Sequence, residues 1–395
     1  MTADLHPKTN ADVLAAVQWA AAEKTPIEII GQGSKCTVGR PMQTAHTLDL
    51  SGLSGVTLFE PEELVLSAKA GTPLKEIAEL LDKHDQELQF EPTDLGPLLG
   101  APAGQGTLGG LVSTNICGPR RLKSGSVRDH ILGINAVSGR GEEFKSGGRV
   151  VKNVTGYDLA KGVTGAYGTL AVLTDIIVKV LPKAETEQTL VLKGLSAAEA
   201  TFAMARAMGS SAEVSGAAHI PADVAGGDAS TLLRLEGFAP SVAYRIEKLA
   251  TLLKDHGSPD RLDEQSSKAQ WWAVRDCIPF AGDQDKPVWR ISCTPSEGHK
   301  IVASIKDSLS ADAFYDWQGG LIWMQINSED PKADQVRSAV KTHGGGHATL
   351  IRADASTRQN VPVFEPQPAP LAALSKRYRE NFDPNGVLNP GRMVG

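Results

Sequence analysis

The sequence predicts an α+β protein whose two halves are organised differently. In the first half, expected helices and strands alternate and are interrupted by glycine clusters at 31–35, 104–110 and 165–169. In the second half, a β-α-β-β-α order is followed by a β-α-β-β-α-β order. Two such units side by side favour one antiparallel sheet covered by helices.

The chain is long enough for more than one domain. Its 395 residues can form two or three domains with substantial cores. We expect a first domain over residues 1–183, an α+β sheet domain over residues 184–360, and a C-terminal helix and tail over residues 361–395. The first boundary follows Pro182, where a strongly β-forming segment ends.

Elements of the first half follow from hydrophobic periodicity and from proline and glycine positions. Thr9 or Asn10 can cap a first helix, and Pro26 separates this helix from a strand. Pro73 can occupy the first position of a second helix. The other expected elements are a strand at 27–30, a β-rich stretch at 48–70 and a hairpin at 131–144.

Elements of the second half follow the same signals. Strands are expected at 189–193, 214–220, 231–236, 287–294, 314–317, 321–326 and 348–352. Helices are expected at 196–208, 241–256, around 271–275, from 296 onward, at 332–343 and at 371–382. A proline-rich segment at 362–370 precedes the last helix and is expected to run over the surface.

Composition excludes several classes of protein. The formal net charge is -6 at pH 7 and the charges are mixed along the chain, so no basic stripe points to nucleic acid. The four cysteines form no C-x-x-C pair, which argues against a zinc or iron–sulfur site held by this chain alone. No apolar run is long enough to cross a bilayer, and no signal peptide is evident. We expect a soluble protein of a reducing compartment.

The first glycine cluster, residues 31–35, follows an expected strand and can turn main-chain N–H groups toward an anion. It is not a complete Rossmann fingerprint, because Cys36 stands where the third glycine or alanine belongs and no helix follows. The spacing of a Walker loop is absent too. Taken alone, this segment is also compatible with an ordinary β-turn.

The second cluster, residues 104–110, is denser and contains apolar residues, which argues against a flexible linker. We expect residues 111–115 to form a short helix whose N-terminal amides face an anion. The third cluster, residues 165–169, lies between a short helix and a β-forming segment, where glycine lets main chain approach a ligand closely. We infer that the three loops converge on one large anionic cofactor.

The order of these clusters resembles the FAD-binding domain of the vanillyl-alcohol oxidase and p-cresol methylhydroxylase (PCMH) flavoproteins. Segments GPRR at 118–121, RDH at 128–130 and VKNVTGYD at 151–158 look like the FAD-binding subunits of bacterial glycolate oxidase, which is a dehydrogenase. The tail FDPNGVLNPG at 382–391 resembles the family's C-terminal segment. The resemblance implies a two-subdomain PCMH-type FAD-binding domain, an α+β antiparallel-sheet cap domain, and a C-terminal segment that returns to the FAD domain.

The resemblance implies FAD as cofactor and assigns its contacts. The first two clusters would hold the pyrophosphate and ribityl chain, with Ser34 and Thr107 as side-chain donors. The third cluster would lie near the isoalloxazine and ribityl end, and Ile176 or Ile177 near the adenine. Many relatives attach the flavin to a histidine of the first cluster, where this chain has Lys35, so FAD is expected to bind noncovalently. The expected cofactor-binding residues are Gly31, Gln32, Gly33, Ser34, Lys35, Pro102, Gly104, Gly106, Thr107, Gly109, Gly110, Ser113, Asn153, Tyr157, Gly165, Gly168, Thr169, Ile176 and Ile177.

The substrate side departs from what the resemblance implies. Related 2-hydroxy-acid dehydrogenases bind a divalent metal through a His-x-Gly-Asp-Gly-Asn-x-His strand and a later Glu-His pair. Here Asp316 and Trp323 occupy the two histidine positions, and tryptophan cannot ligate a metal. His347 is the one histidine where the Glu-His pair would stand. We therefore expect no metal site.

Two arginines are candidates for holding a substrate carboxylate. Trp271-Trp272-x-x-Arg275 resembles the Trp-x-x-Arg of the dehydrogenases, whose arginine pairs with the substrate carboxylate, and a guanidinium offers two parallel N–H donors. Arg290 is a second candidate donor. The alternative is a structural helix with tryptophan packed on the core and Arg275 reaching to its edge.

Three functions remain open. The first is an FAD-binding subunit of a heteromeric glycolate dehydrogenase with a degenerate site of its own; a second FAD-containing subunit would convert glycolate to glyoxylate, and an iron–sulfur subunit would take the electrons. The second is a self-sufficient FAD-dependent 2-hydroxy-acid or alcohol oxidoreductase. The third is a nucleotide-binding protein without a redox role. The first function implies a cytoplasmic protein that reaches the inner face of the plasma membrane only through its partners.

Overall fold

The strands of the N-terminal part form two main sheets in the computed structural model, which describes residues 3–150 and 156–394. A small parallel sheet has the order β1 (Ala3–Leu5), β3 (His46–Asp49), β2 (Ile27–Ile30). An antiparallel sheet has the order β4 (Val56–Glu60), β5 (Val65–Lys69), β9 (Ala171–Lys179), β7 (Ile131–Ser138), β8 (Glu143–Gly147). A short pair, β6 (Gln86–Glu87) with β10 (Leu181–Pro182), completes this part, which we call the N-terminal domain. The predicted strand at 27–30 and the predicted hairpin are confirmed.

Short helices cover and connect the two sheets of the N-terminal domain. They are α1 (Asn10–Glu23), α2 (Leu74–Asp82), α3 (Leu108–Thr114), α4 (Arg121–Ser124), α5 (Val127–His130) and α6 (Leu159–Val163). Thr9 caps α1 in a capping box with Asp12, as the sequence predicted. Pro73 precedes α2 as its N-cap residue, so the prediction that it fills the first helical position is wrong.

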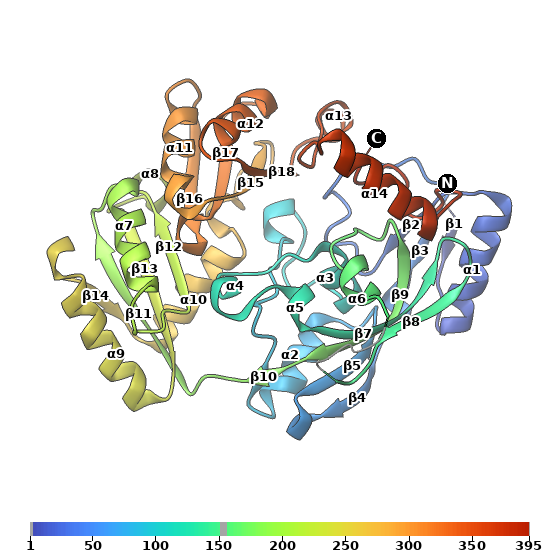
Figure 1. Cartoon of the computed structure of the whole chain (residues 1–395), viewed down its shortest axis with the longest axis horizontal. Helices are drawn as coiled ribbons and strands as arrows, with labels where there is room; N and C mark the ends of the chain where they lie inside the picture. Colours follow the sequence, from blue (N-terminus) through green and yellow to red (C-terminus); the bar gives the residue numbers. More distant parts are fainter. Residues whose placement is uncertain (1–2, 151–155, 395) are drawn as a thin grey trace.

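One eight-stranded antiparallel sheet forms the second part, which we call the cap (Figure 1). Its order is β14 (Asp260–Leu262), β11 (Thr186–Lys193), β13 (Ser230–Gly237), β12 (Gly216–Ile220), β16 (Ala311–Asp316), β17 (Leu321–Ile326), β15 (Val288–Cys293), β18 (Gly346–Arg352). The first four strands come from the first repeat unit and the last four from the second, in mirrored order. The single sheet predicted from the two units is confirmed.

The two faces of the cap sheet have different neighbours. Its helices are α7 (Ala197–Met208), α8 (Ala222–Ala225), α9 (Ala239–Leu252), α10 (Glu264–Arg275), α11 (Gly298–Lys306) and α12 (Ala333–Thr342). Leu190 and Leu233 pack in one core with buried residues of α7 and α9, whereas Leu232 and Phe314 belong to a cluster shared with the N-terminal domain. Alternation along the strands therefore leaves one sheet face for the interface between the domains.

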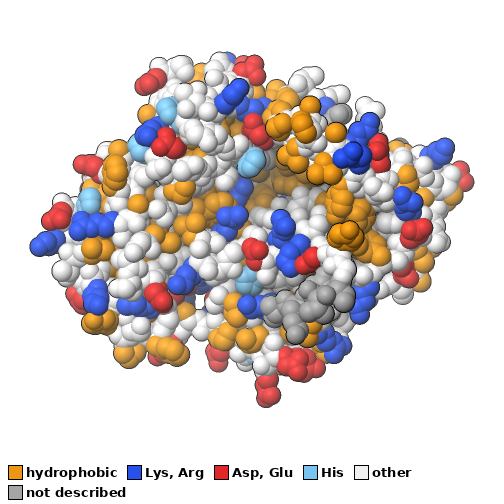
Figure 2. Space-filling view, viewed as in Figure 1, with side chains coloured by type: hydrophobic (Ala, Val, Ile, Leu, Met, Phe, Trp, Pro, Cys, Tyr) orange, Lys and Arg blue, Asp and Glu red, His pale blue; other side chains and the backbone are white. Residues whose placement is uncertain are grey.

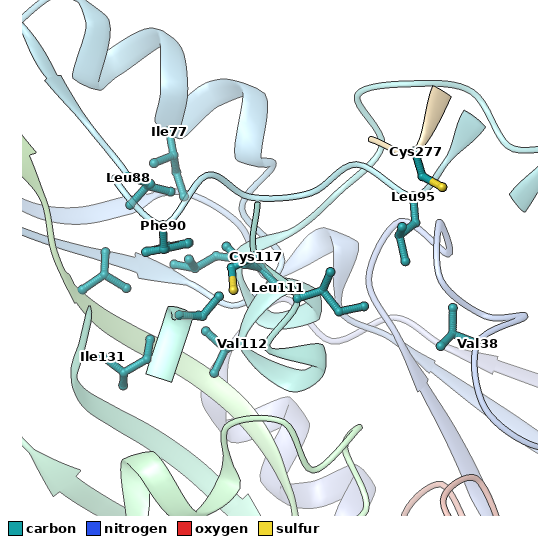
Figure 3. Packing of buried hydrophobic residues seen from close by; sticks show 14 of the residues in the cluster. Val38, Ile77, Leu88, Phe90, Leu95, Leu111, Val112, Cys117, Ile131 and Cys277 are labelled. Atoms are coloured by element: carbon teal, nitrogen blue, oxygen red, sulfur yellow. The ribbon is translucent and has the colours of Figure 1, made fainter. Parts of the chain in front are cut away.

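The shared cluster continues deep into the N-terminal domain. Figure 3 shows part of it, with Phe90, Leu111 and Cys117 from the first half of the chain and Cys277 from the second. Among the described residues, no helix is both long and apolar enough to span a membrane.

The C-terminal segment returns to the N-terminal domain, as the resemblance implied. After α13 (Ala355–Asn360) and α14 (Ala369–Phe382), the tail runs beside β2. The Ile27 N–H donates to the Val387 carbonyl at 2.8 Å, and the Ile29 N–H donates to Asn389 Oδ1 at 2.8 Å. In Figure 1, α14 lies across this domain, near both termini.

Candidate functional site

A first cleft opens where β2, α3, the start of β9 and the C-terminal tail meet. Its empty space is about 720 Å³. The predicted residues that line it are Gly31, Gln32, Gly33, Ser34, Lys35, Thr107, Gly109, Gly110, Ser113 and Gly168. The structure thus brings together members of all three glycine clusters, although residues 31–35, 104–110 and 165–169 are well separated in sequence.

The turn after β2 presents main-chain donors to this cleft. The N–H groups of Gln32, Gly33 and Ser34 have no acceptor among the described residues. Gly33 has a φ of 75°, a left-handed conformation that glycine adopts without strain. Successive unpaired N–H groups form a concavity that favours an anion, and phosphate oxygens fit it.

The clusters approach one another closely because glycine has no side chain. A Cβ on Gly31 would lie 2.4 Å from Thr107 Oγ1, so the first cluster touches the second directly. A Cβ on Gly168 would lie 2.6 Å from Asn389 Nδ2, so the third cluster touches the tail in the same way. The cleft is a cradle whose walls leave no room for larger residues at these two positions.

The second cluster lines the cleft, but the N–H groups at the start of α3 are already bonded to acceptors within the protein. The helix begins at Leu108, and the N–H groups of Leu108 and Gly109 donate to the carbonyls of Thr72 and Ala70 at 3.0 and 2.7 Å. The Gly110 N–H donates to Thr107 Oγ1 at 3.2 Å. The prediction that the N-terminal amides of this helix face an anion is therefore wrong, because protein acceptors already satisfy them.

A second, larger cleft lies between the N-terminal domain and the cap. Its empty space is about 1760 Å³, and its walls include Gly104, Gly106, Trp272 and Arg275. Lys35 lines both clefts, so they adjoin at its side chain. Burial lowers the pKa of the Lys35 ammonium, and the negative charge of Asp94 opposes this shift.

A buried network of charges joins the two domains at this second cleft. Arg234 of the cap donates to both carboxylate oxygens of Glu91 at 2.8 and 3.0 Å. Arg120 of the N-terminal domain donates through Nε to both oxygens of Glu236 at 3.0 and 3.1 Å, and through Nη1 to Glu87 at 2.9 Å. Burial alone would raise the pKa of Glu236, but the Arg234 and Arg120 guanidinium groups outweigh it and lower that pKa to about 2. The sequence did not reveal this network, although Arg120 lies in the GPRR segment.

The two predicted carboxylate-binding arginines occupy different places. Arg275 lines the second cleft and donates through Nε and Nη2 to Asp276 at 2.8 and 2.6 Å, which leaves Nη1 for a ligand. Arg290 on β15 lies with its guanidinium carbon 4.9 Å from the centre of the Trp317 ring and lines neither cleft. The structure does not bring these two side chains into one pocket.

The positions of the metal ligands in the related dehydrogenases are occupied by other residue types here. Asp316 is buried and accepts a hydrogen bond from the main-chain N–H of Trp317 at 2.7 Å, and Trp323 is buried in the shared cluster. Burial raises the pKa of Asp316 to about 7. In the part of the chain that the structure describes, no group of three His, Cys, Asp or Glu side chains could hold a metal ion.

Several expected cofactor contacts do not line either cleft. Ile176 is fully buried in the core between β5 and β7, and Ile177 lines a separate surface depression with Thr57 and Asn135. The side chains of Ile176 and Ile177 point to opposite faces of the sheet, because successive side chains alternate along a strand. Pro102, Tyr157, Gly165 and Thr169 also lie outside the clefts, and Asn153 falls outside the described residues.

Tyr167, Asn389 and Arg392 are among the residues of the first cleft that were not predicted. Tyr167 lines it in a left-handed conformation, with a φ of 53°. Asn389 and Arg392 come from the tail, and Arg392 donates through Nη2 to the Lys35 carbonyl at 2.8 Å. The signal for Asn389 is the tail motif at 382–391, and Arg392 directly follows this motif.

Comparisons of sequence identify relatives of the whole chain. Residues 2–147 match a family model described as an FAD binding domain. Glycolate oxidase subunit GlcE of Escherichia coli (strain K12) is 34% identical over 382 residues, which cover 96% of this chain and 96% of that protein. Glycolate oxidase subunit GlcD of Bacillus subtilis (strain 168) is 26% identical, over 67% of this chain and 53% of that protein.

Solved structures share the fold at low sequence identity. p-Cresol methylhydroxylase with bound substrate superposes with a TM-score of 0.73 at 14% identity, covering 99% of this chain and 88% of that one. Alkyldihydroxyacetonephosphate synthase has a TM-score of 0.70 at 15% identity, covering 98% of this chain and 75% of that one. The chain therefore shares the fold of p-cresol methylhydroxylase, contains an FAD binding domain, and belongs to the family of the glycolate oxidase subunit GlcE.

Proposed function

We propose that this chain binds FAD noncovalently in the two adjoining clefts and acts as the FAD-binding subunit of a heteromeric glycolate dehydrogenase. The proposal depends above all on the unpaired N–H groups of Gln32, Gly33 and Ser34 at the wall of the first cleft. Bound FAD supplies a redox centre that accepts electrons and passes them on. The family relationship supports an FAD-linked oxidoreductase role for the chain.

The residues of the clefts fit such a dinucleotide. The turn at 31–35 would hold the pyrophosphate with main-chain N–H groups and the Ser34 hydroxyl. Lys35, at the junction of the clefts, would add a positive charge where the phosphates end and the ribityl chain begins. Because a lysine ammonium stands where many relatives have a flavin-linked histidine, the attachment is noncovalent.

Oxidation of glycolate is assigned to a partner rather than to this chain. Arg275 is paired with Asp276, and tryptophan replaces one metal ligand of the related dehydrogenases. A second FAD-containing subunit would oxidise glycolate to glyoxylate, and an iron–sulfur subunit would take the electrons from the flavins. The complex would be cytoplasmic and would reach the inner face of the plasma membrane only peripherally.

An apolar surface on α14 supports the proposal that this chain binds a partner subunit. Every residue from 366 to 374 is exposed, and α14 has no buried residue. Leu371 and Leu374 are 48% and 54% exposed. Figure 2 shows hydrophobic side chains gathered where α14 crosses the N-terminal domain. Tyr378 and Phe382 of α14 pack against the core of the N-terminal domain, whereas Leu371 and Leu374 lie on the exposed side, and an exposed apolar patch marks an interface.

The test is an anaerobic titration of the purified chain with glycolate, followed by the absorbance of its flavin. Acid precipitation should release all of the flavin as FAD, and glycolate should leave the flavin of the isolated chain oxidised. Adding the two partner subunits should then allow its reduction. Rapid bleaching by glycolate without partners, abolished in Arg275→Ala, would contradict this assignment and support a self-sufficient oxidoreductase.

A further inference from the structure

The C-terminal tail is bonded to the turn that carries the first glycine cluster. Arg392 donates through Nη2 to the Lys35 carbonyl at 2.8 Å and through Nε to the Val38 carbonyl at 3.3 Å. The main-chain N–H of Arg40 donates back to the Arg392 carbonyl at 2.9 Å. A Cβ on Gly39 would lie 2.9 Å from both Cγ and the carbonyl oxygen of Arg392. The tail and this turn are therefore in direct contact and form one packed unit.

These bonds occupy carbonyl groups of the turn and leave its N–H groups free. The Gly39 carbonyl also accepts from an arginine, through Nη1 of Arg358 in α13, at 2.8 Å. By contrast, no described residue supplies an acceptor for the N–H groups of Gln32, Gly33 and Ser34. Because arginines bond the carbonyl oxygens, which are the negative ends of the peptide groups, the positive N–H ends remain for the first cleft.

Arg392 and Lys35 are two buried cations that line this cleft. Arg392 is 6% exposed and Lys35 is 9% exposed, and neither forms an ion pair with a carboxylate of the described residues. The negative charge of Asp94 acts on Lys35, but its two carboxylate oxygens accept the N–H groups of Gly96 and Gly104 at 2.9 and 2.6 Å. Burying a charge is costly unless an opposite charge meets it, so an anion in the cleft would be stabilised.

Arg392 keeps hydrogen-bond donors for a ligand. Its Nε and Nη2 groups are used by the turn, whereas Nη1 has no acceptor in the part of the chain that the structure describes. Glu28 and Asp49 lie near enough to act on the Cys36 thiol, as Arg392 does, but neither carboxylate is paired with the guanidinium. Asp49 instead accepts the Ser51 N–H at 2.8 Å. The positive charge of Arg392 is therefore available at the cleft.

We infer that Arg392 of the C-terminal tail helps to hold the pyrophosphate of FAD. It adds a positive charge beside that of Lys35, and its bonds to the carbonyls keep the first turn in the shape that leaves its N–H groups free. The inference rests on the proposed function, which places FAD in this cleft. The tail is then a fourth part of the cofactor site, besides the three glycine clusters. Because Arg392 acts through its charge, lysine can replace it and a neutral side chain cannot.

Fluorescence titration of FAD into the flavin-free chain tests this role with a matched pair of variants. Arg392→Gln keeps a side-chain N–H donor for the turn but removes the charge, so FAD should bind at least about tenfold more weakly, the worth of one charge-assisted hydrogen bond. Arg392→Lys keeps a donor and the charge and should bind FAD within about threefold of the unaltered chain.

The control removes an equal charge from the same turn. Arg40 lines neither cleft and donates through Nη2 to the Gln359 carbonyl at 2.9 Å. Arg40→Gln should therefore bind FAD like the unaltered chain. The melting midpoint of each flavin-free variant is measured first, so that a loss of affinity is not taken from an unfolded preparation.

Three results would overturn the inference: equal FAD affinity in Arg392→Gln and the unaltered chain, a loss of about tenfold or more in Arg392→Lys, or an equal loss in Arg40→Gln and Arg392→Gln. The result for Arg392→Lys decides even if Arg392→Gln does not fold. If the unaltered chain binds no FAD, the proposed function fails together with the inference. If the unaltered chain binds FAD and Arg392→Gln binds it equally, only the inference fails.

Discussion

The Glu91→Gln substitution removes one negative charge from the interdomain network and keeps the size of the side chain. Glu91 accepts two hydrogen bonds from Arg234 and one, at 2.6 Å, from the Arg120 main-chain N–H. Burial alone would raise the pKa of the Glu91 carboxyl, but Arg234 and Arg120 outweigh it and lower that pKa below its usual range. The carboxylate is therefore charged in the folded protein at neutral pH.

The expected cost follows from what the substitution leaves behind. Arg234 donates to both carboxylate oxygens of Glu91, and its side chain is only 1% exposed. An amide has one acceptor oxygen, so the substitution leaves one of these two donors without its acceptor. Removing one member of a buried ion pair costs about 3–5 kcal/mol. Glu236 still lies 3.2 Å from Arg234 Nε, so we expect the lower end, about 3 kcal/mol.

Thermal unfolding measured by calorimetry provides the assay. For a cooperative unit of about 150–250 residues, a loss of about 3 kcal/mol lowers the midpoint by roughly 6–12 °C. The matched control is Glu247→Gln, which breaks an exposed pair with Arg261 whose side chains are 64% and 43% exposed; its midpoint should not move measurably. Adding Arg234→Met to Glu91→Gln should restore part of the loss, because the unpaired cation is then gone.

A midpoint for Glu91→Gln that falls no further than that of Glu247→Gln would refute the reasoning. It would mean that the interdomain network contributes no more to stability than a surface ion pair. No restoration in the double variant would show that the loss comes from altered packing rather than from an uncompensated charge.

Three further predictions concern cofactor, pH and assembly. Gly31→Ala places a Cβ 2.4 Å from Thr107 Oγ1, so the flavin-to-protein ratio after purification should fall well below that of the unaltered chain; an equal ratio would show that the first two clusters need not touch. The folded pKa of Glu236 is about 2 against an ordinary 4.5, so the unfolded chain takes up this proton first, and the stability it contributes is complete above about pH 4.5 and lost as pH falls toward 2. Urea midpoints that do not drop between about pH 6 and pH 3 would contradict this sign. Leu374→Glu should abolish co-purification with a partner subunit and leave the melting midpoint of the chain unchanged, since Leu374 is exposed; unchanged co-purification would remove α14 from the interface.

The cap was predictable from sequence because its strands and helices have clear hydrophobic periods. Its two units predicted most of the strands and helices and the single sheet. Strand β14 was missed because it has three residues, Asp260–Leu262, two of them charged, at the edge of the sheet. A short polar edge strand has no periodic signal, and only pairing with β11 defines it.

The candidate site was predictable where it depends on glycine. Clusters at 31–35 and 104–110 mark close approach of main chain whatever surrounds them. Arg234 and Glu91 lie 143 residues apart, and their pairing depends on how the cap docks, so no local pattern indicates it. The burial of the Ile176 side chain was not predictable for the same reason, because the direction of a side chain on a central strand depends on the register of its neighbours.

Equilibrium binding of FAD and FMN to the flavin-free chain tests the central claim most directly. If separated glycine turns form one cradle for a dinucleotide, one FAD should bind per chain, and FMN, which lacks the pyrophosphate and the adenosine, should bind at least about a hundredfold more weakly. Equal affinity for FMN and FAD, or no binding of either, would contradict the account.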